Sequence, residues 1–239
     1  KNKLNVQPNI VLFITESYGR EYIGAFNQNT NIPDYKSYTP FLDSLATKSL
    51  VFDNAFANGR KSIHGMSSIL AGIPSFKDAF TSSPYANQEI ESVVSVLNSE
   101  GYDTSFFHGA PNGSMGFLGF SNILGFDHYY GKTEFVNDSL FDGFWGIWDE
   151  EFFQFYLATR QRNRHFLQII HLVQVGQDHV HFQCDSNPNG RPLLRYLSHI
   201  HEQSHTSVIH LDVQYLVPEA MPERRLFYQR PFLLEWLRS

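Results

Sequence analysis

The chain has 239 residues, enough for one large domain or two small ones. Its hydrophobic content of 42% and charged content of 18% are typical of a globular protein and exclude a disordered one. The formal net charge of −6 argues against nucleic acid or an anionic membrane surface as a general partner, although a metal ion would let an acidic protein bind an anionic substrate.

The cysteine content, the lengths of the apolar runs and the first residue of the chain further limit the kind of protein that this can be. Cys184 is the only cysteine, so the chain forms no internal disulfide. No apolar run approaches the length of about 18 residues that a membrane helix needs. The chain starts at Lys1 with neither a methionine nor a signal peptide, and we expect it to be a piece of a longer protein.

The first 159 residues show alternating strand and helix patterns. The first predicted elements are a strand over 9–15 that ends at Glu16, a helix over about 39–48 with Thr39 as N-cap and Pro40 at its first position, and a short strand over 50–52. A helix from Ser62 to the stop at Gly72 and a helix over 88–99 follow. The last are a strand over 102–107 that ends at His108 and a helix over 149–159. Such alternation predicts an α/β fold with a largely parallel sheet.

Residues 160–239 differ in composition from the rest. The first 159 residues hold seven Lys and two Arg, whereas the last 80 hold no Lys, nine Arg and eight of the eleven His. Strand-like stretches occur over 167–175 and 207–216, without regular caps or glycine stops. Three interpretations stay open for this tail: a divergent second half, a separate small module, or a sequence from a shifted reading frame or a faulty join.

Three polar residues fall where an α/β fold collects its reactive groups. Glu16 and His108 follow predicted strands, and the carboxyl ends of parallel strands meet at one edge of the sheet. Ser62 opens a helix whose N-terminal amides can receive a phosphate, with Lys61 and Arg60 adding positive charge. A divalent ion held by Glu16 would activate the Ser62 hydroxyl for attack on phosphorus.

Each of these residues also has a structural interpretation. Ser62 alone is more typical of an N-cap, and Glu16 alone of a solvated loop acid or a helix cap. Lys61 alone is typical of a solvated loop charge, and His108 of an ordinary loop histidine. The pattern by itself leaves both interpretations open.

Five ordered motifs resemble one family. They lie at residues 8–17 (PNIVLFITES), 39–46 (TPFLDSLA), 52–62 (FDNAFANGRKS), 106–115 (FFHGAPNGSM) and 141–150 (FDGFWGIWDE). Together they resemble the lipoteichoic acid synthase-like phosphoglycerol transferases of the alkaline phosphatase/sulfatase superfamily, over about two thirds of the chain. The resemblance implies an alkaline phosphatase-like α/β/α sandwich with a mostly parallel sheet, whose second half is incomplete or aberrant. Residues 1–159 would be the N-terminal part of the catalytic domain and 160–239 an atypical tail.

The resemblance also implies a mechanism. It makes Glu16 a metal ligand and Ser62 both a ligand and the nucleophile of a covalent phospho-enzyme, with Mn²⁺ or Mg²⁺ rather than Zn²⁺ as the metal. It implies a phospholipid or lipid-linked phosphodiester as substrate, and a catalytic domain that lies outside the cytoplasm and is attached to the cell membrane by helices preceding this chain. The sulfatase maturation motif is absent, because Ile63-His64-Gly65-Met66 follows Ser62, and this favours direct attack by Ser62.

The motifs further imply substrate-binding roles for five residues. Lys61, His108, Asn112, Trp145 and Asp149 fall in motifs near the family's substrate cleft. For Trp145 and Trp148 the alternative is a place in the aromatic core.

The sequence departs from the family in the second half of its metal site. The family supplies an Asp-His pair after a late strand, and the nearest candidate here, Asp178-His179, arrives only 116 residues after Ser62. The histidine pairs at 179/181 and 199/201 are weak indications of Zn²⁺ or Ni²⁺. We therefore expect a metal-dependent phosphotransferase that is impaired in this chain. The alternatives are a phosphoethanolamine transferase or phosphodiesterase of the same superfamily, or a non-catalytic remnant or binding module.

Overall fold

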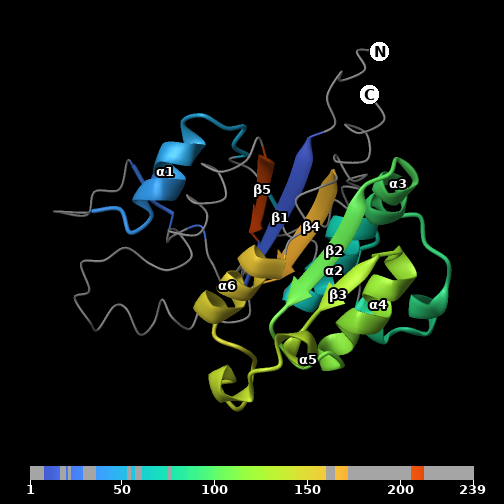
Figure 1. Ribbon diagram of the computed structural model, residues 1–239. Helices are drawn as coiled ribbons and strands as arrows, with labels where there is room; N and C mark the ends of the chain where they lie inside the picture. The colour runs from blue at the N-terminus through green and yellow to red at the C-terminus, as the bar shows by residue number, and fades with distance from the viewer. Residues whose placement is uncertain are drawn as a thin grey trace, which may run out of the picture.

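A five-stranded sheet forms the centre of the protein in the computed structural model (Figure 1). The structure describes residues 8–16, 20, 23–28, 36–52, 55–56, 61–74, 77–159, 165–171 and 206–212. The strands are β1 (Asn9–Thr15), β2 (Asp103–His108), β3 (His128–Tyr130), β4 (Phe166–His171) and β5 (Thr206–Asp212). They lie in the order β3-β2-β4-β1-β5, and every pairing between them is parallel.

The helices lie on both faces of this sheet. They are α1 (Pro40–Ala46), α2 (Ser62–Ala71), α3 (Val93–Ser99), α4 (Phe117–Leu124), α5 (Lys132–Phe135) and α6 (Asp149–Thr159). Short 3-10 turns occur at Gly24–Phe26, Phe80–Ser82, Pro84–Asn87, Ser114–Gly116 and Asp138–Leu140. None of the helices that the structure describes is long and apolar enough to cross a membrane. The three layers confirm the predicted α/β/α architecture.

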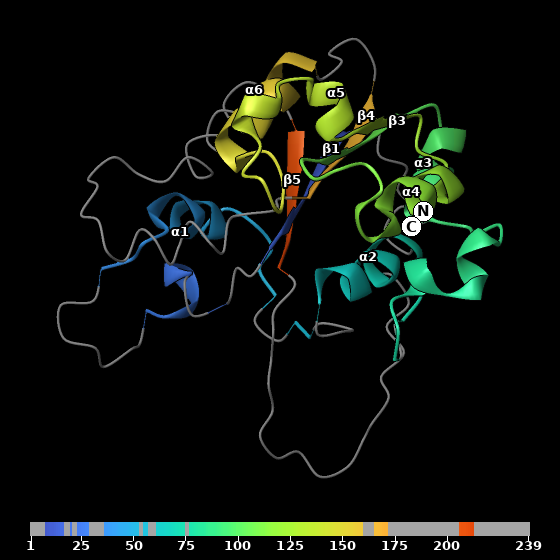
Figure 2. The same ribbon diagram turned by 90° about the horizontal axis from the view of Figure 1, so that it is seen from below.

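Two apolar clusters hold the layers together. Alternate residues of β1 point to opposite faces, as the period of a strand requires. Val11 and Phe13 pack with α1 and α6, whereas Ile10, Leu12 and Ile14 pack with α2, α3 and α4. Figure 2 shows α5 and α6 on one side of the sheet and α2, α3 and α4 on the other.

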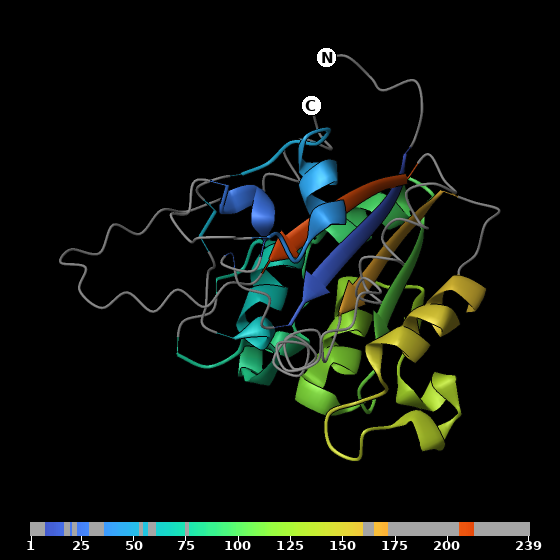
Figure 3. The ribbon, with the colours of Figure 1, turned by 90° about the vertical axis from the view of Figure 1, so that its left-hand side faces the viewer.

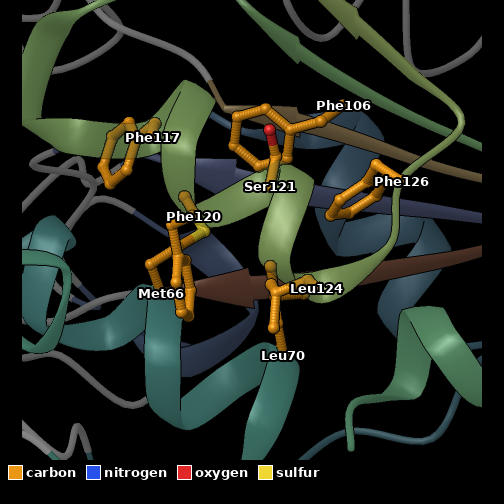
Figure 4. A pocket seen from close by; sticks show the side chains of 8 residues that line it. All are labelled: Met66, Leu70, Phe106, Phe117, Phe120, Ser121, Leu124 and Phe126. Carbon is orange, nitrogen blue, oxygen red and sulfur yellow. The ribbon is translucent and has the colours of Figure 1, made fainter. Parts of the chain in front are cut away.

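The space between α2, α4 and β2 belongs to this core. Figure 4 shows its lining side chains, which are Met66, Leu70, Phe106, Phe117, Phe120, Ser121, Leu124 and Phe126. They leave no room for a water molecule. The hydroxyl of Ser121 donates to the carbonyl oxygen of Leu118 at 2.8 Å within the same helix. This region is packed protein interior and offers no substrate cavity.

The structure corrects some predicted boundaries. Residues 50–52 form no strand and are exposed, so that prediction is wrong; their β-favouring side chains find no strand to pair with among the described residues. The helix predicted over 88–99 begins only at Val93, because Ser92 caps it: its hydroxyl accepts from the Ser95 amide at 3.0 Å. The helix predicted over 39–48 ends at Ala46.

Other predictions are confirmed. The helices at 62–71 and 149–159 have the expected bounds, and Gly72 ends the first in the left-handed conformation with a φ of 67°. The strand-like stretches in the tail supply β4 and β5, which flank β1 on both sides. The two strands next to β1 therefore both come from residues beyond 160.

Candidate functional site

The carboxyl ends of the strands define the candidate site. All strands are parallel and point the same way, as Figure 3 shows for β1, β4 and β5. Glu16 directly follows β1, and His108, His171 and Asp212 are the last residues of β2, β4 and β5. In open α/β sheets, ligands and reactive groups collect at this edge. The topology thus gathers titratable residues from four separate segments.

The strand register places two acidic residues at neighbouring strand ends. Thr15 pairs with Asp212 across β1 and β5, and Glu16 is the next residue of the chain. Carboxylate oxygens are the donors that Mg²⁺ and Mn²⁺ prefer. The backbone register thus places Glu16 and Asp212, two residues of the type that supplies such oxygens, at the ends of adjacent strands. Within the described ranges, no three His, Cys, Asp or Glu side chains are already arranged around a metal position.

Sequence reasoning missed Asp212. The stretch 207–216 was identified as strand-like, but its end is not fixed by a cap or a glycine. Only the pairing with β1 shows that the strand stops at Asp212, level with Thr15. A useful signal was available: an acid at the end of a parallel strand next to β1 falls beside Glu16.

Ser62 is the first residue of α2 and is not its N-cap. Lys61 is the N-cap, with an extended backbone at φ −142° and ψ 151°. Its carbonyl oxygen accepts from the amides of His64 at 2.9 Å and Gly65 at 3.2 Å. No side chain caps this helix, so the capping interpretation of the Ser62 hydroxyl is wrong.

Ser62 lies on the sheet-facing side of α2. Residues four apart share one face of a helix, and Ser62, Met66 and Leu70 form such a row. Met66 and Leu70 are buried in the cluster that also contains Ile14 of β1, and Ser62 itself is only 8% exposed. Ser62 is therefore largely shielded from solvent, whereas Lys61 before it is exposed.

His108 is fully buried beneath α4. Its Nδ1 atom lies 3.3 Å from the Tyr129 hydroxyl, and the Phe117 ring contacts its imidazole edge-to-face at 4.9 Å between centroids. Burial, with a smaller contribution from Glu134, strongly raises the pKa of the Tyr129 phenol. Tyr129 therefore stays protonated at every physiological pH. A substrate-contacting role of His108 stays a prediction.

Asn112 helps to hold α5 in place. Its amide nitrogen donates to both carboxylate oxygens of Glu134, at 3.1 and 3.0 Å, and its amide oxygen accepts from the Thr133 amide at 3.2 Å. Glu134 in turn accepts from the Gly131 amide at 2.6 Å. This network gives Asn112 a structural role that the sequence did not indicate, and its substrate-binding role stays a prediction.

Trp145 and Trp148 are exposed, so the core interpretation is wrong for both. They follow Phe141, which forms an antiparallel bridge with Ile147 in a short hairpin. Asp149, at the start of α6, is buried. Both tryptophans lie on solvent-facing parts of the segment between α5 and α6.

Backbone hydrogen bonds attach this hairpin to the strand-end edge. The Ile147 amide of the hairpin donates to the Gly109 carbonyl oxygen at 2.9 Å, and the Lys132 amide at the start of α5 donates to that of Ala110 at 3.1 Å. Gly109 directly follows His108 at the end of β2. The hairpin with Trp145 thus lies beside the end of β2. Asp178 and His179 lie outside the described residues.

Comparison with known proteins shows which family and which solved structures this chain resembles. A family model described as sulfatase matches residues 8–199. Similar solved structures include a protein in the alkaline phosphatase superfamily from Vibrio parahaemolyticus (TM-score 0.71, 19% identity, 92% of this chain and 57% of that one) and the lipoteichoic acid synthase LtaP from Listeria monocytogenes (TM-score 0.69, 17% identity, 90% and 58%). The C-terminal periplasmic domain of EcEptC from Escherichia coli, in complex with Zn, has a TM-score of 0.50 at 16% identity (80% and 55%). The chain therefore spans somewhat more than half of the structures it resembles.

Proposed function

Because this chain belongs to the sulfatase family, we propose that it is a metal-dependent phosphotransferase of the lipoteichoic acid synthase-like type, with Ser62 as the nucleophile. The observation that carries the proposal is the position of Ser62. Its hydroxyl takes no part in helix capping, and the residue is buried at the first position of α2. A helix N-terminus without a side-chain cap offers its amide groups and its positive dipole end to an anion.

Glu16, Asp212 and Ser62 are the residues that would hold the metal. They are oxygen donors, which favours Mn²⁺ or Mg²⁺ over Zn²⁺. When bound, such an ion would supply the positive charge that favours the Ser62 alkoxide and the developing charge on phosphorus. Enzymes of this superfamily generally use a divalent metal, and a zinc complex occurs among the similar structures.

The chain's own residues account for the remaining chemistry. The Ser62 hydroxyl loses its proton as its oxygen bonds to phosphorus; the bond from phosphorus to the leaving oxygen breaks, that oxygen takes up a proton and departs as an alcohol, and a phosphodiester on Ser62 remains. Lys61 places an exposed ammonium group next to the nucleophile, where it attracts the phosphodiester. An acceptor hydroxyl or water then displaces Ser62 from phosphorus and restores it.

The proposed substrate is a phospholipid or lipid-linked phosphodiester outside the cytoplasm, from which a phosphoglycerol-type group is transferred. The similarity to the structure of a lipoteichoic acid synthase supports this class of substrate, and the similarity to a periplasmic domain supports the location. The alternative is a phosphoethanolamine transferase or phosphodiesterase, which would use the same nucleophile on another head group. A binding module that has lost catalysis is the second alternative, and it predicts ligand stabilisation without turnover.

Turnover of a chromogenic phosphodiester tests the proposal. The protein is incubated with the substrate in Mn²⁺, in Mg²⁺ and in EDTA, and Ser62→Ala is compared with Ser67→Ala. Ser67 lies in the same helix and is also buried, but its hydroxyl donates to the Ile73 carbonyl oxygen at 2.9 Å. We expect turnover that needs metal, is abolished by Ser62→Ala and persists in Ser67→Ala. Equal turnover by wild type and Ser62→Ala would overturn the catalytic proposal.

A further inference from the structure

Three large aromatic side chains of the hairpin between α5 and α6 are exposed, and two of them are in contact. In this aromatic hairpin, residues 141–148, Phe144 is 76% exposed, Trp145 47% and Trp148 45%. The Phe144 and Trp145 rings contact each other edge-to-face, with centroids 4.9 Å apart. Folded proteins seldom keep large aromatic groups clustered in water unless the cluster serves an interaction.

The aromatic hairpin is held in one conformation by Asp142. Its Oδ1 atom accepts from the amides of Phe144 and Trp145 at 2.8 Å and of Gly146 at 3.0 Å. Its own amide donates to the Gly146 carbonyl oxygen at 2.9 Å, and Gly143 takes the left-handed conformation that the turn needs. The exposed rings are thus presented by an ordered turn, so that little conformational entropy is lost when they bind.

The hairpin lies at the end of the sheet where the reaction is proposed. Its base is hydrogen-bonded to Gly109, directly after β2. Figures 1 and 3 show the segment between α5 and α6 at the end toward which the strand arrows point. A surface that receives these rings would therefore lie beside the strand-end edge.

The charges around the hairpin indicate what kind of surface fits it. Lys132 pairs with Asp138 and lies 4.9 Å from the centre of the Phe141 ring. Asp142, Glu150 and Glu151 add negative charge nearby. This acidic surround disfavours nucleic acid and anionic lipid, because like charges repel. Tryptophan favours the headgroup region of a bilayer, where its ring is partly buried and its N–H stays hydrated.

We propose that the aromatic hairpin inserts into the headgroup layer of a zwitterionic lipid bilayer and so brings the strand-end edge to a lipid-borne substrate. The inference rests on the proposed function for the substrate class. The inference goes beyond the proposed function because it assigns a membrane-contacting surface to Phe144, Trp145 and Trp148. The binding of this surface to a membrane does not depend on Ser62. Insertion is driven by apolar burial and not by charge, so it should be insensitive to salt.

Vesicle binding by the full chain tests this inference. Wild type and a Phe144→Ser/Trp145→Ser/Trp148→Ser variant are sedimented with phosphatidylcholine vesicles, at low and at high salt. Tyr85→Ser is the matched control, because Tyr85 is an exposed aromatic residue (68%) on the short turn Pro84–Asn87, which contacts α4. Circular dichroism and thermal unfolding check that each variant is folded.

We expect the triple variant to need at least about tenfold more lipid for half-maximal binding, whereas Tyr85→Ser binds like wild type. Tryptophan emission of the wild type should shift to the blue on vesicle addition, and brominated phosphatidylcholine should quench it. Unchanged binding by the triple variant would overturn the inference. So would binding that disappears in high salt, or loss of the exposed rings into a dimer in analytical ultracentrifugation.

The two proposals fail separately. Ser62→Ala should bind vesicles like wild type, and a Phe144→Ser/Trp148→Ser variant, which keeps Trp145, should turn over a water-soluble phosphodiester like wild type. Vesicle binding without Ser62-dependent turnover would overturn the proposed function alone. Ser62-dependent turnover without vesicle binding would overturn the membrane inference alone.

Discussion

Replacing Gly146 by alanine tests the contact that joins the aromatic hairpin to the loop after β2. A Cβ atom at this position would lie 2.9 Å from the carbonyl oxygen of Gly109, 3.1 Å from its carbonyl carbon and 3.2 Å from the Ala110 nitrogen. All three are backbone atoms, so no side chain can rotate away. The backbones must separate, which would strain the packing and break the hydrogen bond from the Ile147 amide to Gly109.

The expected loss of stability follows from these two effects. Overpacking costs about 1–3 kcal/mol. The lost hydrogen bond adds about 0.5–1.5 kcal/mol. We therefore expect Gly146→Ala to lower the free energy of unfolding by about 2–4 kcal/mol, measured by urea unfolding with circular dichroism.

Gly119→Ala is the matched control. Gly119 lies within α4, and a Cβ atom there would meet nothing within 4 Å. Alanine is the better helix former, so this variant should gain about 0.5–1 kcal/mol. If Gly146→Ala proves as stable as wild type, the close approach of the two backbones does not exist in solution and the hairpin is not fixed to the end of β2.

Two further substitutions test the described hydrogen bonds. The carboxylate of Asp127 accepts from the amide and hydroxyl of Thr104; burial opposes ionisation, but these bonds, Asn98 and His128 outweigh it and lower the pKa. Because the pKa of Asp127 is lower in the folded than in the unfolded state, its ionised carboxylate stabilises the fold above the unfolded pKa, and this stabilisation is lost as the pH falls through the folded pKa. Urea unfolding should therefore show Asp127→Asn to be less stable than wild type at about pH 7, with a difference that shrinks toward about pH 3. A difference that does not depend on pH would contradict this explanation. The Tyr156 hydroxyl donates to the side-chain oxygen of Gln168 at 2.8 Å in the protein interior. Tyr156→Phe should therefore lower the free energy of unfolding by about 1–3 kcal/mol in the same assay. Unchanged stability would show that another group satisfies Gln168.

Local patterns in the sequence were sufficient for several elements. The helix at 149–159 begins with three acidic residues that suit a helix N-terminus and has its predicted bounds. The run 9–15 formed the buried strand β1. The prediction for 50–52 failed because β-favouring residues form a strand only where a partner strand is available.

Long-range order could not be predicted from local patterns. Nothing in the run Phe166–His171 shows that it pairs with β1 on one side and β2 on the other, because strand order depends on contacts between distant segments. The same limit hid Asp212, which becomes a candidate ligand only through its register with Thr15. Glu16 and Ser62, by contrast, were identified from their positions at a strand end and a helix start.

The exposure of Trp145 and Trp148 could also not be predicted from the sequence. Aromatic residues in such a segment are equally compatible with a core position. The turn around Asp142 decides the outcome, since its three amide hydrogen bonds direct the chain back toward Gly109 and leave the rings outside. These hydrogen bonds form only in the folded chain, so the turn could not be predicted from the sequence.

A covalent adduct on Ser62 tests the central claim most directly. The protein is incubated with Mn²⁺ and a phosphodiester substrate, quenched in acid and digested with trypsin, and the peptide 62–77 is fragmented to separate Ser62 from its other serines. We predict a mass increase equal to the phosphoryl group together with the alcohol that stays esterified to it, located on Ser62 and absent in Ser62→Ala. Turnover without an adduct on Ser62, or an adduct on another residue with turnover unaffected by Ser62→Ala, would contradict the account.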